Sequence, residues 1–555
     1  MSTTSRRTRQ GAGAVVASVT LLGAVGILAA GTAAAAPNYA SAANLTSTGP
    51  SVFSASPSDQ QVAALKLTEV VAGGLDATAP DNYVCVALSG GASFANTASQ
   101  TPSVTSSANN VGPATVAGGE LVFPVTAASS APATYSLSNL YVTGTAGAHG
   151  PVIATVTEGE NSSCSATTGT YTLSSKASVY GVETFTQNNY GQSADATAAN
   201  EFSSQVNCGD AHPAQNTAVI ATNLDPYDAL SAATLEGALN ATGSPAGLLI
   251  TPQGAPGSEL MNALKADGVG TVYVVGGQYA ISAQVIAALK STPATTCNGT
   301  SAIATSSNLK VIGPIAGQTA DDTAAAIDTQ ANSILALNHN LPAPATSEND
   351  TAGNTAGTWT SGAPTAILVA DSDWSDAMAV AGVAYQFQIP VVLTPGNSLG
   401  SAASTELSNL HVKNVLALGG QLALQNTVVN QLAASGYAVA RIAGQDATDT
   451  AQLLSRYELA VVSAGGLGWS AAASHTALLA QGAYWSDALG AAVISANESA
   501  PILLTEGPTK GLGNYTPGGL SAASSSVYNL QVLGGPFAVP QSQISAALTA
   551  LASTS

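Results

Sequence analysis

Residues 485–505 read WSDALGAAVISANESAPILLT, and this stretch decides the fold. An aromatic-x-Asp-Ala element opens it, and the spacing predicts a helix over 487–494. Pro501 then opens a short apolar strand that ends at Thr505. A helix followed by a strand with no polar alternation is typical of a parallel sheet that helices cover on both faces.

The two elements of this stretch occur three times along the chain. The first copy lacks the residue between the aromatic residue and the aspartate. The aromatic elements are Tyr227-Asp228-Ala229, Trp374-Ser375-Asp376-Ala377 and Trp485-Ser486-Asp487-Ala488, and the proline-led strands are 245–251, 390–394 and 501–505.

Two more landmarks complete each copy. An octamer of pattern G-Q-x-A-x-x-T-A precedes the aromatic element, with copies 126 and 127 residues apart, and an apolar strand closed by a glycine pair follows the proline-led strand. The octamers are 191–198, 317–324 and 444–451, and the glycine pairs are 276–277, 419–420 and 534–535. Four landmarks in the same order in three copies indicate tandem repeats.

The repeats predict the domain organisation. We expect an α/β fold with three tandem α/β repeats and mostly parallel sheets over 179–300, 301–436 and 437–555. In the second copy, residues 337–364 are rich in Pro, Asn, Thr and Gly, which predicts a long surface loop. Residues 37–178 instead show alternating apolar runs between glycine turns, which predicts an antiparallel β-sandwich.

The first 36 residues have the order of a secretory signal peptide. Arg6, Arg7 and Arg9 precede an apolar run that ends in small residues, and we expect cleavage near Ala35 or Ala36. A retained membrane anchor is the alternative. After removal of the signal, no run of about 18 apolar residues remains to span a membrane.

The chain has four cysteines, Cys85, Cys164, Cys208 and Cys297. An even number in an exported chain fits two disulfides, and three pairings exist. We favour Cys85–Cys164 and Cys208–Cys297, because each pair then lies within one predicted domain. A metal site is the alternative, although the chain has no C-x-x-C motif.

The repeats resemble the type 2 cell-wall-binding repeats of Gram-positive surface proteins. The third copy carries the resemblance most fully, and the whole of it covers roughly residues 179–555. The matching residues are Arg441-Ile442-Ala443-Gly444 with Thr450-Ala451, the aromatic element 485–489, the strand 501–505 and the pair Gly534-Gly535. The resemblance implies packing around a pseudo-threefold axis and non-covalent binding to an anionic secondary polymer of the cell wall.

The charge of the chain departs from that pattern. Arg441 alone keeps the basic residue that opens each family copy, and glutamine-containing sequence replaces the family's Asp-Arg. The chain has 12 basic and 31 acidic residues, a net charge of −19, with 8% charged residues in all. This balance argues against a nucleic-acid partner. It also favours either a neutral wall polysaccharide or divalent cations that bridge acidic groups, with no other cofactor expected.

The repeated aspartates are the candidate ligand-binding residues. Asp228, Asp376 and Asp487 could accept hydrogen bonds from sugar hydroxyls, or they could cap helices or pair with helix dipoles. The adjacent aromatic residues could stack on a sugar ring or pack between repeats. The full candidate set is Tyr227, Asp228, Trp374, Asp376, Arg441, Trp485 and Asp487. The glycine pairs indicate tight turns, and Thr197, Thr323 and Thr450 indicate helix caps.

These features predict a non-enzymatic, secreted surface protein with an outward-facing β-domain for adhesion or interaction. One alternative is a wall-modifying hydrolase delivered by the repeats, for which Glu120, Glu158 and Glu160 are the carboxylates to test. Another is a structural protein of a surface layer.

Overall fold

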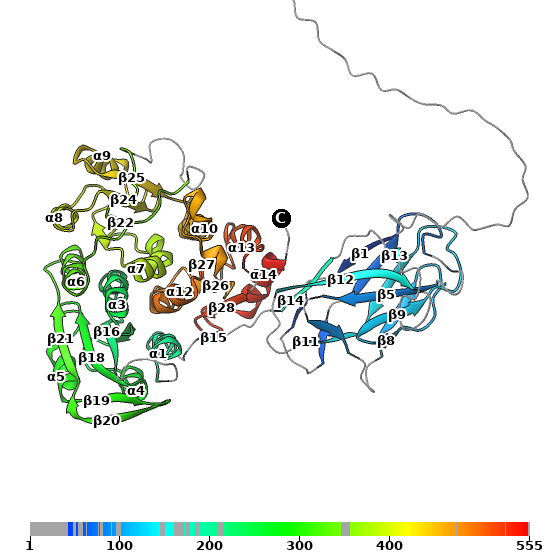
Figure 1. Cartoon of the computed structure of the whole chain (residues 1–555), viewed down its shortest axis with the longest axis horizontal. Coiled ribbons are helices and arrows are strands. Elements are labelled where there is room, and N and C mark those ends of the chain that lie inside the picture. Colours follow the sequence, from blue (N-terminus) through cyan, green and yellow to red (C-terminus); the bar gives the residue numbers. More distant parts are fainter. Residues whose placement is uncertain are drawn as a thin grey trace, which may run out of the picture.

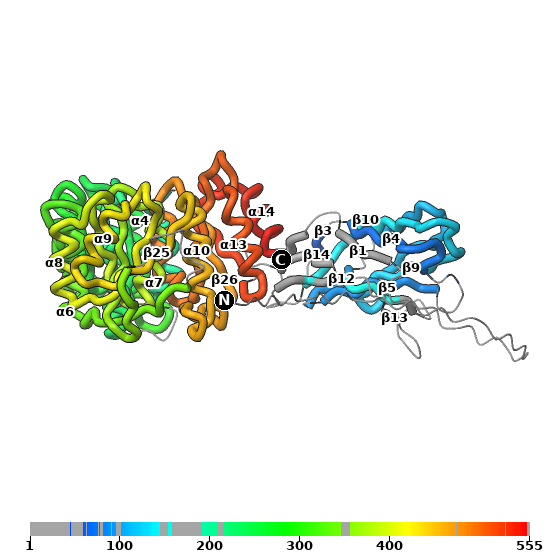
Figure 2. Tube along the Cα trace, turned by 90° about the horizontal axis from the view of Figure 1, so that it is seen from above, coloured from blue at the N-terminus to red at the C-terminus, as the bar shows by residue number. Residues whose placement is uncertain are grey.

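The computed structural model shows two lobes, one of strands alone and one of mixed strands and helices, lying end to end (Figures 1 and 2). The predicted signal peptide, 1–36, lies outside the described residues. The structure describes residues 43–47, 51–53, 59–62, 64–75, 77, 82–89, 91–95, 101–144, 150–159, 171–172, 178–183, 188–189, 191, 193–208, 215–345, 356–472, 474–527 and 529–552.

The N-terminal lobe is all β, as predicted. Its strand pairs are antiparallel, apart from the parallel pair of β14 with β2. One sheet has the order β1 (Ala43–Ser47), β4 (Leu65–Glu69), β10 (Thr134–Ser138), β7 (Ser103–Ser106). A second has the order β2 (Ser51–Phe53), β14 (Ser178–Glu183), β12 (Gly150–Gly159), β5 (Tyr83–Leu88), β9 (Glu120–Pro124), β8 (Thr115–Ala117), with β13 (Tyr171–Thr172) on β12. A third consists of β3 (Gln60–Val62), β11 (Leu140–Gly144) and β6 (Ala92–Phe94).

A buried carboxylate lies at one edge of this all-β core. Glu69 ends β4 and accepts hydrogen bonds from the backbone N–H of Ala133 at 2.8 Å, from Tyr135 Oη at 3.1 Å and from Ser129 Oγ. Burial, with the nearby Glu69, raises the pKa of Tyr135 to about 12. The hydrogen bonds satisfy a charge that would otherwise be costly to bury.

The C-terminal lobe contains three four-stranded sheets, each wholly parallel and each with the same order of strands. Apart from the edge strand Lys310–Ile315 of the first sheet, the strands whose burial is described are buried along nearly their whole length, which explains their unbroken apolar sequences. The sheets are β17 (Ala246–Thr251), β16 (Asn216–Thr222), β18 (Val269–Val275), β21 (Lys310–Ile315); then β23 (Val391–Thr394), β22 (Thr365–Ala370), β24 (Asn414–Leu418), β25 (Ala438–Ile442); then β27 (Ile502–Thr505), β26 (Thr476–Gln481), β28 (Asn529–Leu533), β15 (Asn188–Asn189).

The fourth strand of every sheet comes from the chain that leads into another copy. β21 leads into the second octamer and β25 into the third. β15 precedes the first octamer yet pairs with β28 of the last copy, with Asn188 opposite Val532. The beginning of the repeat region therefore completes the sheet at its end (Figure 1).

Helices of three kinds recur around these sheets. α3 (Ala232–Ala241), α7 (Ala381–Phe387) and α12 (Ala492–Glu498) pack against one another in the middle of the lobe (Figure 1). The octamers lead into α1 (Ala194–Gln205), α6 (Ala320–Ile334) and α10 (Ala447–Leu459). The aromatic elements lie at α2 (Tyr227–Leu230), the 3-10 helix η2 (Ser375–Val380) and α11 (Ser486–Gly490), which are followed by α3 (Ala232–Ala241), α7 (Ala381–Phe387) and α12 (Ala492–Glu498).

The remaining elements lie further along each copy. In the third copy the single helix predicted over 487–494 is in fact two, because the helix breaks at Ala491. After the proline-led strands come α4 (Ser258–Ala266), α8 (Ser401–Asn409) and α13 (Thr516–Ala523), and after the glycine pairs come α5 (Ala283–Ser291), α9 (Asn426–Ala434) and α14 (Gln541–Ala552). Short elements complete the lobe: the hairpin β19 (Pro293–Asn298) and β20 (Ser301–Asn308), and the 3-10 helices η3 (Val462–Ala464) and η4 (Trp469–Ala471).

Small residues allow the central helices to approach closely. A Cβ atom on Gly237 of α3 would overlap the backbone carbonyl of Tyr385 on α7. A Cβ atom on Gly382 of α7 would likewise overlap Ser495 Oγ on α12. Tyr385 of the second copy also contacts the sheet of the first copy, because its Oη donates to the carbonyl of Ala246 on β17 at 2.9 Å.

The octamers form one repeated hydrogen-bonded turn. In each copy the N–H of the first glycine donates to the threonine Oγ1 six residues later, at 3.0 Å, from Gly191 to Thr197, Gly317 to Thr323 and Gly444 to Thr450. The predicted role of these threonines as N-caps is wrong, because Ser193, Thr319 and Asp446 are the N-cap residues. The threonines instead hold the turn that precedes each helix.

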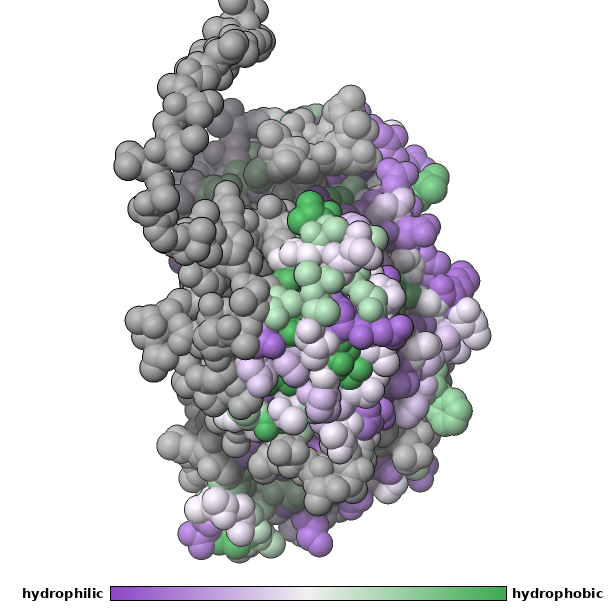
Figure 3. Space-filling model, turned by 90° about the vertical axis from the view of Figure 1, so that its right-hand side faces the viewer, coloured by the Kyte–Doolittle hydropathy of each residue, from purple (hydrophilic) through white to green (hydrophobic). Residues whose placement is uncertain are grey.

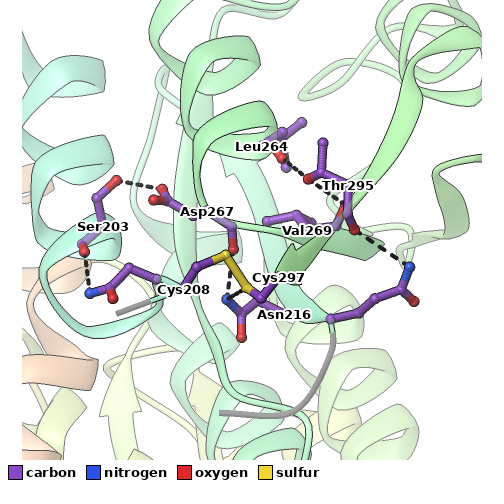
Figure 4. The surroundings of a disulfide bond; sticks show 10 residues. Ser203, Cys208, Asn216, Leu264, Asp267, Val269, Thr295 and Cys297 are labelled. Atoms are coloured by element: carbon purple, nitrogen blue, oxygen red, sulfur yellow. Dashed lines mark hydrogen bonds between the residues drawn. A yellow bond between two sulfur atoms is a disulfide. The ribbon is translucent and has the colours of Figure 1, made fainter. Parts of the chain in front are cut away.

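The predicted disulfide Cys208–Cys297 is present and joins the segment after α1 to β19 (Figure 4). The two Cα atoms are 5.2 Å apart. Beside it, Asn216 Nδ2 donates to the carbonyl of Asp267 at 2.6 Å. Cys85 is also disulfide-bonded, and Cys164 lies outside the described residues.

The insertion in the second copy is not simply a surface loop, as the sequence predicted. Leu337 and Leu341 are buried in the core, and Trp359 Nε1 donates to the Leu341 carbonyl at 3.1 Å. Tyr457 Oη of α10 donates to the carbonyl of Pro342 at 2.8 Å. The described parts of the insertion therefore cover the core between the second and third copies.

The core of the C-terminal lobe contains carboxyl groups as well as apolar side chains. Burial raises the pKa of Glu236 on α3 to about 8 and that of Asp267 to about 6. Burial also raises the pKa of Glu201 on α1 and Glu458 on α10 well above the ordinary value. In the described part of the chain, no helix combines the length and apolarity needed to cross a bilayer.

Gly237→Ala is predicted to lower the free energy of unfolding of the C-terminal lobe. The added methyl group meets backbone in the central helix contact, and overpacking of this kind costs about 1–3 kcal/mol. Gly518→Ala in α13 is the matched control, because a Cβ there has open space and alanine is the better helix former. Denaturant unfolding of both variants checks this. Equal stability of the two would contradict the close central contact.

The buried acids predict a stability that falls as pH rises. Their pKa values are higher in the folded chain than the unfolded value of about 4, so their contribution is complete in acid and is lost as pH rises through the folded values, about 6 for Asp267 and about 8 for Glu236. Calorimetry at pH 5 and pH 9 should show the lower melting temperature at pH 9. Glu236→Gln should reduce that fall, whereas Asp59→Asn, at an exposed position of the all-β lobe, should leave it unchanged.

Candidate functional site

In each copy an aspartate carboxylate packs against the first glycine of the glycine pair. Asp228, Asp376 and Asp487 lie in the first turns of α2, η2 and α11 and are buried. The first glycine of each pair has a positive φ, and a Cβ atom on it would overlap the aspartate Oδ2. The φ angles are 102° at Gly276, 96° at Gly419 and 89° at Gly534. Glycine is thus required twice over, by its backbone conformation and by the adjacent carboxylate.

The three carboxylates have similar electrostatic environments, dominated by burial. Burial raises the pKa of each to about 6. Hydrogen bonds oppose this shift in two copies, from Thr450 to Asp376 and from Gln481 to Asp487. Thr450 belongs to the next copy, so Asp376 lies at a junction between copies.

The predicted capping role of these aspartates is not seen. None of the three short helices has a side-chain hydrogen bond at its N-cap residue, which is Pro226, Trp374 or Trp485. The aspartates lie inside the first turn, where a negative charge pairs favourably with the helix dipole.

The other predicted ligand residues are also buried or half-buried. Tyr227 and Trp374 are half-buried and pack against the hydrophobic core, and Trp485 is buried. Arg441 on β25 is 0% exposed, and its Nη2 donates to the carbonyl of Leu424 at 2.8 Å. The guanidinium group therefore lies inside the second sheet rather than on the surface.

A large apolar side chain projects from the same position after each glycine pair. Tyr279 is 81% exposed, Leu422 101% and Phe537 93%. Each lies two residues after the second glycine, in the sequences GGQY, GGQL and GGPF. Sequence reasoning missed these residues, although their constant spacing from the glycine pairs was a signal that could have found them. We call Tyr279, Leu422 and Phe537 the tip residues.

Two pockets lie where the copies meet. The first, of about 270 Å³, is lined by Asp376 and Leu422 of the second copy and by Gly444 and Asp446 of the third. The second, of about 370 Å³, is lined by Asp487, Tyr484 and Phe537 of the third copy and by Gly191 and Thr197 of the first. No lysine or arginine is among the residues that line either pocket. We call these the junction pockets.

The first and second copies approach each other through the same elements. Gly277 of the first glycine pair faces Ala316, the residue before the second octamer, and Gly420 faces Gly444 of the third octamer in the same way. Asp228 and Tyr279 therefore occupy at this junction the positions that Asp376 and Leu422 occupy at the next.

The remaining candidates lie elsewhere. Among the residues that the structure describes, no three histidines, cysteines, aspartates or glutamates gather as metal ligands would. Glu120 begins β9, and burial raises its pKa. The Glu158 side chain and Glu160 are outside the described set.

Comparison with known proteins identifies the second and third copies. Residues 315–429 and 441–544 match the family model described as cell wall binding domain 2. The chain is 28% identical over 179 residues to N-acetylmuramoyl-L-alanine amidase LytC of Bacillus subtilis (strain 168), covering 30% of this chain and 34% of that protein. It is 30% identical over 142 residues to an amidase enhancer of the same organism, covering 26% of this chain and 18% of that protein. The chain thus spans about a third or less of these relatives.

Among solved structures, Cwp6 has a similar fold. Cwp6 from Clostridium difficile superposes with a TM-score of 0.51 at 12% identity, covering 92% of this chain and 68% of that one. Cwp8 from Clostridium difficile covers 66% of this chain and 51% of that one, with a TM-score of 0.47 at 19% identity.

The family match covers two of the three copies that the repeated sheets and the recurring aspartate–glycine contact define in the structure. The second and third copies belong to the cell wall binding domain 2 family, so the chain contains a cell-wall-binding module.

Proposed function

We propose that the three copies form a ring around a pseudo-threefold axis and hold the chain on the cell wall without a covalent bond. The central packing of α3, α7 and α12 and the pairing of β15 with β28 support the ring. Residues 179–300 are then the first copy, because their sheet has the strand order of the other two.

The junction pockets are the ligand sites of this proposal. The observation that carries it is the exposed tip residue beside a buried aspartate in each copy. Small-molecule sites in proteins combine an apolar surface with a few placed polar groups. A tip residue offers the apolar surface for the face of a sugar ring, and the aspartate accepts hydrogen bonds from its hydroxyls.

The charges around the pockets favour a neutral wall polysaccharide. The ionisable groups that line the pocket of the second copy are Asp373, Asp376 and Asp446, all acidic. An anionic polymer would be repelled there unless divalent cations bridged the two. The two junction pockets, together with the equivalent junction between the first and second copies, would bind successive units of the polymer, so that modest affinities combine.

The all-β lobe would then project from the wall as an adhesion or interaction module. Hydrophobic and hydrophilic side chains are interspersed over the described part of its outer face (Figure 3). Export through the predicted signal peptide would deliver the chain to the cell surface.

A wall-modifying hydrolase is the second candidate function, and the similarity to the amidase, which lies over the binding region, leaves the activity of the all-β lobe to be tested. In this candidate the all-β lobe modifies wall material and the repeats deliver it there. Zymography of the full-length chain on purified walls tests it, with cleared substrate as the supporting result and intact substrate as the opposing one.

Substitution of the tip residues by alanine is predicted to weaken wall binding in steps. Each of Tyr279→Ala, Leu422→Ala and Phe537→Ala should lower co-sedimentation of the full-length chain with purified walls by about fivefold, since loss of a central contact commonly costs more than 1 kcal/mol. The triple variant should lose about 100-fold, because avidity needs all three sites. Val462→Ala, which removes another exposed apolar side chain, from η3, is the control. A triple variant that sediments like the native chain would disprove the proposal.

Wall binding is also predicted to resist salt and chelators. Raising NaCl from 0.1 M to 1 M shortens the Debye length from about 10 Å to about 3 Å, which weakens ion pairing but not contacts with a neutral glycan. Co-sedimentation should therefore change by less than about twofold in 1 M salt or in EDTA. Release by EDTA would show instead that cations bridge the chain to an acidic polymer.

A further inference from the structure

The first and third copies meet although no short stretch of chain joins them. We call this contact the closing junction: α1 and β15 of the first copy pack there against α11, α12 and β28 of the third. β15 has only two residues, whereas its counterparts β21 and β25 at the other junctions have six and five. The closing junction therefore depends more than the others on the packing of side chains.

A carboxyl group is buried within the closing junction. Glu201 on α1 is 0% exposed and lies against Gly490 of α11, where a Cβ atom would overlap Glu201 Oε2. The residues equivalent to Gly490 in the other copies, Ser231 and Ala379, are larger. Neither carboxyl oxygen of Glu201 has a hydrogen-bond partner among the described residues. An ionised carboxylate without donors is costly to bury, so the neutral acid is the form that this site accommodates.

The other two junctions have an apolar side chain at the same position. Glu201 lies four residues after the octamer threonine of its copy, and the residues at that spacing in the other copies are Ile327 and Leu454. Both are 0% exposed. Their helices, α6 and α10, pack against α2 and η2 as α1 packs against α11. The fold thus forms this contact twice with an aliphatic residue and once with an acid.

The charges around Glu201 also favour its neutral form. Burial raises the pKa of Glu201 well above the ordinary value, and the nearby Asp487 on α11 raises it further. No basic group lowers the pKa of Glu201. The other ionisable groups on α1 and on the elements packed against it are Asp195 on α1, Glu259 and Lys265 on α4, and Glu498 on α12.

We propose that the closing junction is pH-sensitive: it holds while Glu201 is protonated and opens when Glu201 loses its proton. The ionised carboxylate needs water, which reaches it only when α1 moves away from α11. β15 directly precedes α1 and would separate from β28 with it. Because folding raises the pKa of this acid, the junction is most stable in acid and weakens as pH rises through the value in the folded chain.

Opening of the closing junction would act on the second junction pocket. Asp487 and Phe537 line one side of that pocket, and Gly191 and Thr197 line the other, so its two sides belong to the copies that separate. This consequence for ligand binding rests on the proposed function, whereas the opening itself does not. The opening is measured without ligand, so a failure of wall co-sedimentation leaves its test unaffected.

Hydrogen exchange of the full-length chain at pH 5 and pH 9 tests the proposal. Amide protection, corrected for the intrinsic exchange rate at each pH, should be lower at pH 9 by about tenfold or more in 194–205 and 486–498. The buried strands β22 and β24 of the second sheet are the internal reference, and their protection should change by less than about threefold. Equal losses in the junction and the reference, or no loss in the junction, would overturn the proposal.

Two substitutions of Glu201 separate its ionisation from other effects of pH. Glu201→Gln keeps the size of the side chain and removes its charge, and Glu201→Leu copies Leu454 of the third copy. In both variants the closing junction should keep its protection at pH 9 to within about threefold of the value at pH 5.

Glu458→Gln is the matched control for these variants. Glu458 is also buried, and burial likewise raises its pKa, but it lies on α10, which packs against α13 and η2. This variant should lose protection at the closing junction as the native chain does. A loss of native size in both Glu201 variants would overturn the proposal, and so would a junction that Glu458→Gln keeps closed at pH 9.

Discussion

No copy in the C-terminal lobe completes its own sheet. Three strands of each sheet come from one copy and the fourth from the chain that leads into another, and β15 closes the series by pairing with β28. The junction pockets follow from this sharing, because it brings the octamer of one copy beside the glycine pair of another. The central helices follow as well, since sheets joined in this way direct α3, α7 and α12 toward one another.

The sequence predicted the elements of the repeats well, and the reason is physical. Strands buried on both faces leave unbroken apolar runs, and tight turns leave fixed glycines, so 501–505 and Gly534-Gly535 could be located without a structure. The pairing Cys208–Cys297 also followed from the domain organisation. The family resemblance, drawn from the same motifs, is confirmed over the second and third copies.

The site was less predictable, because it depends on which way side chains face. Nothing local in the sequence shows that Arg441 lies inside a sheet while Phe537 is exposed. The contact between Asp487 and Gly534 joins residues far apart in the chain, so neither one alone reveals the other's role. The insertion of the second copy misled for the same reason: its composition is that of a loop, yet Leu337 and Leu341 reach the core.

The pairing of β15 with β28 also has a consequence for how the chain acquires its structure. Asn188 and Val532 meet only after the whole intervening polypeptide has been made. Contacts of such long sequence separation raise the contact order and slow the final step of folding. The sheet that β15 completes can therefore form only after the last copy has been synthesised.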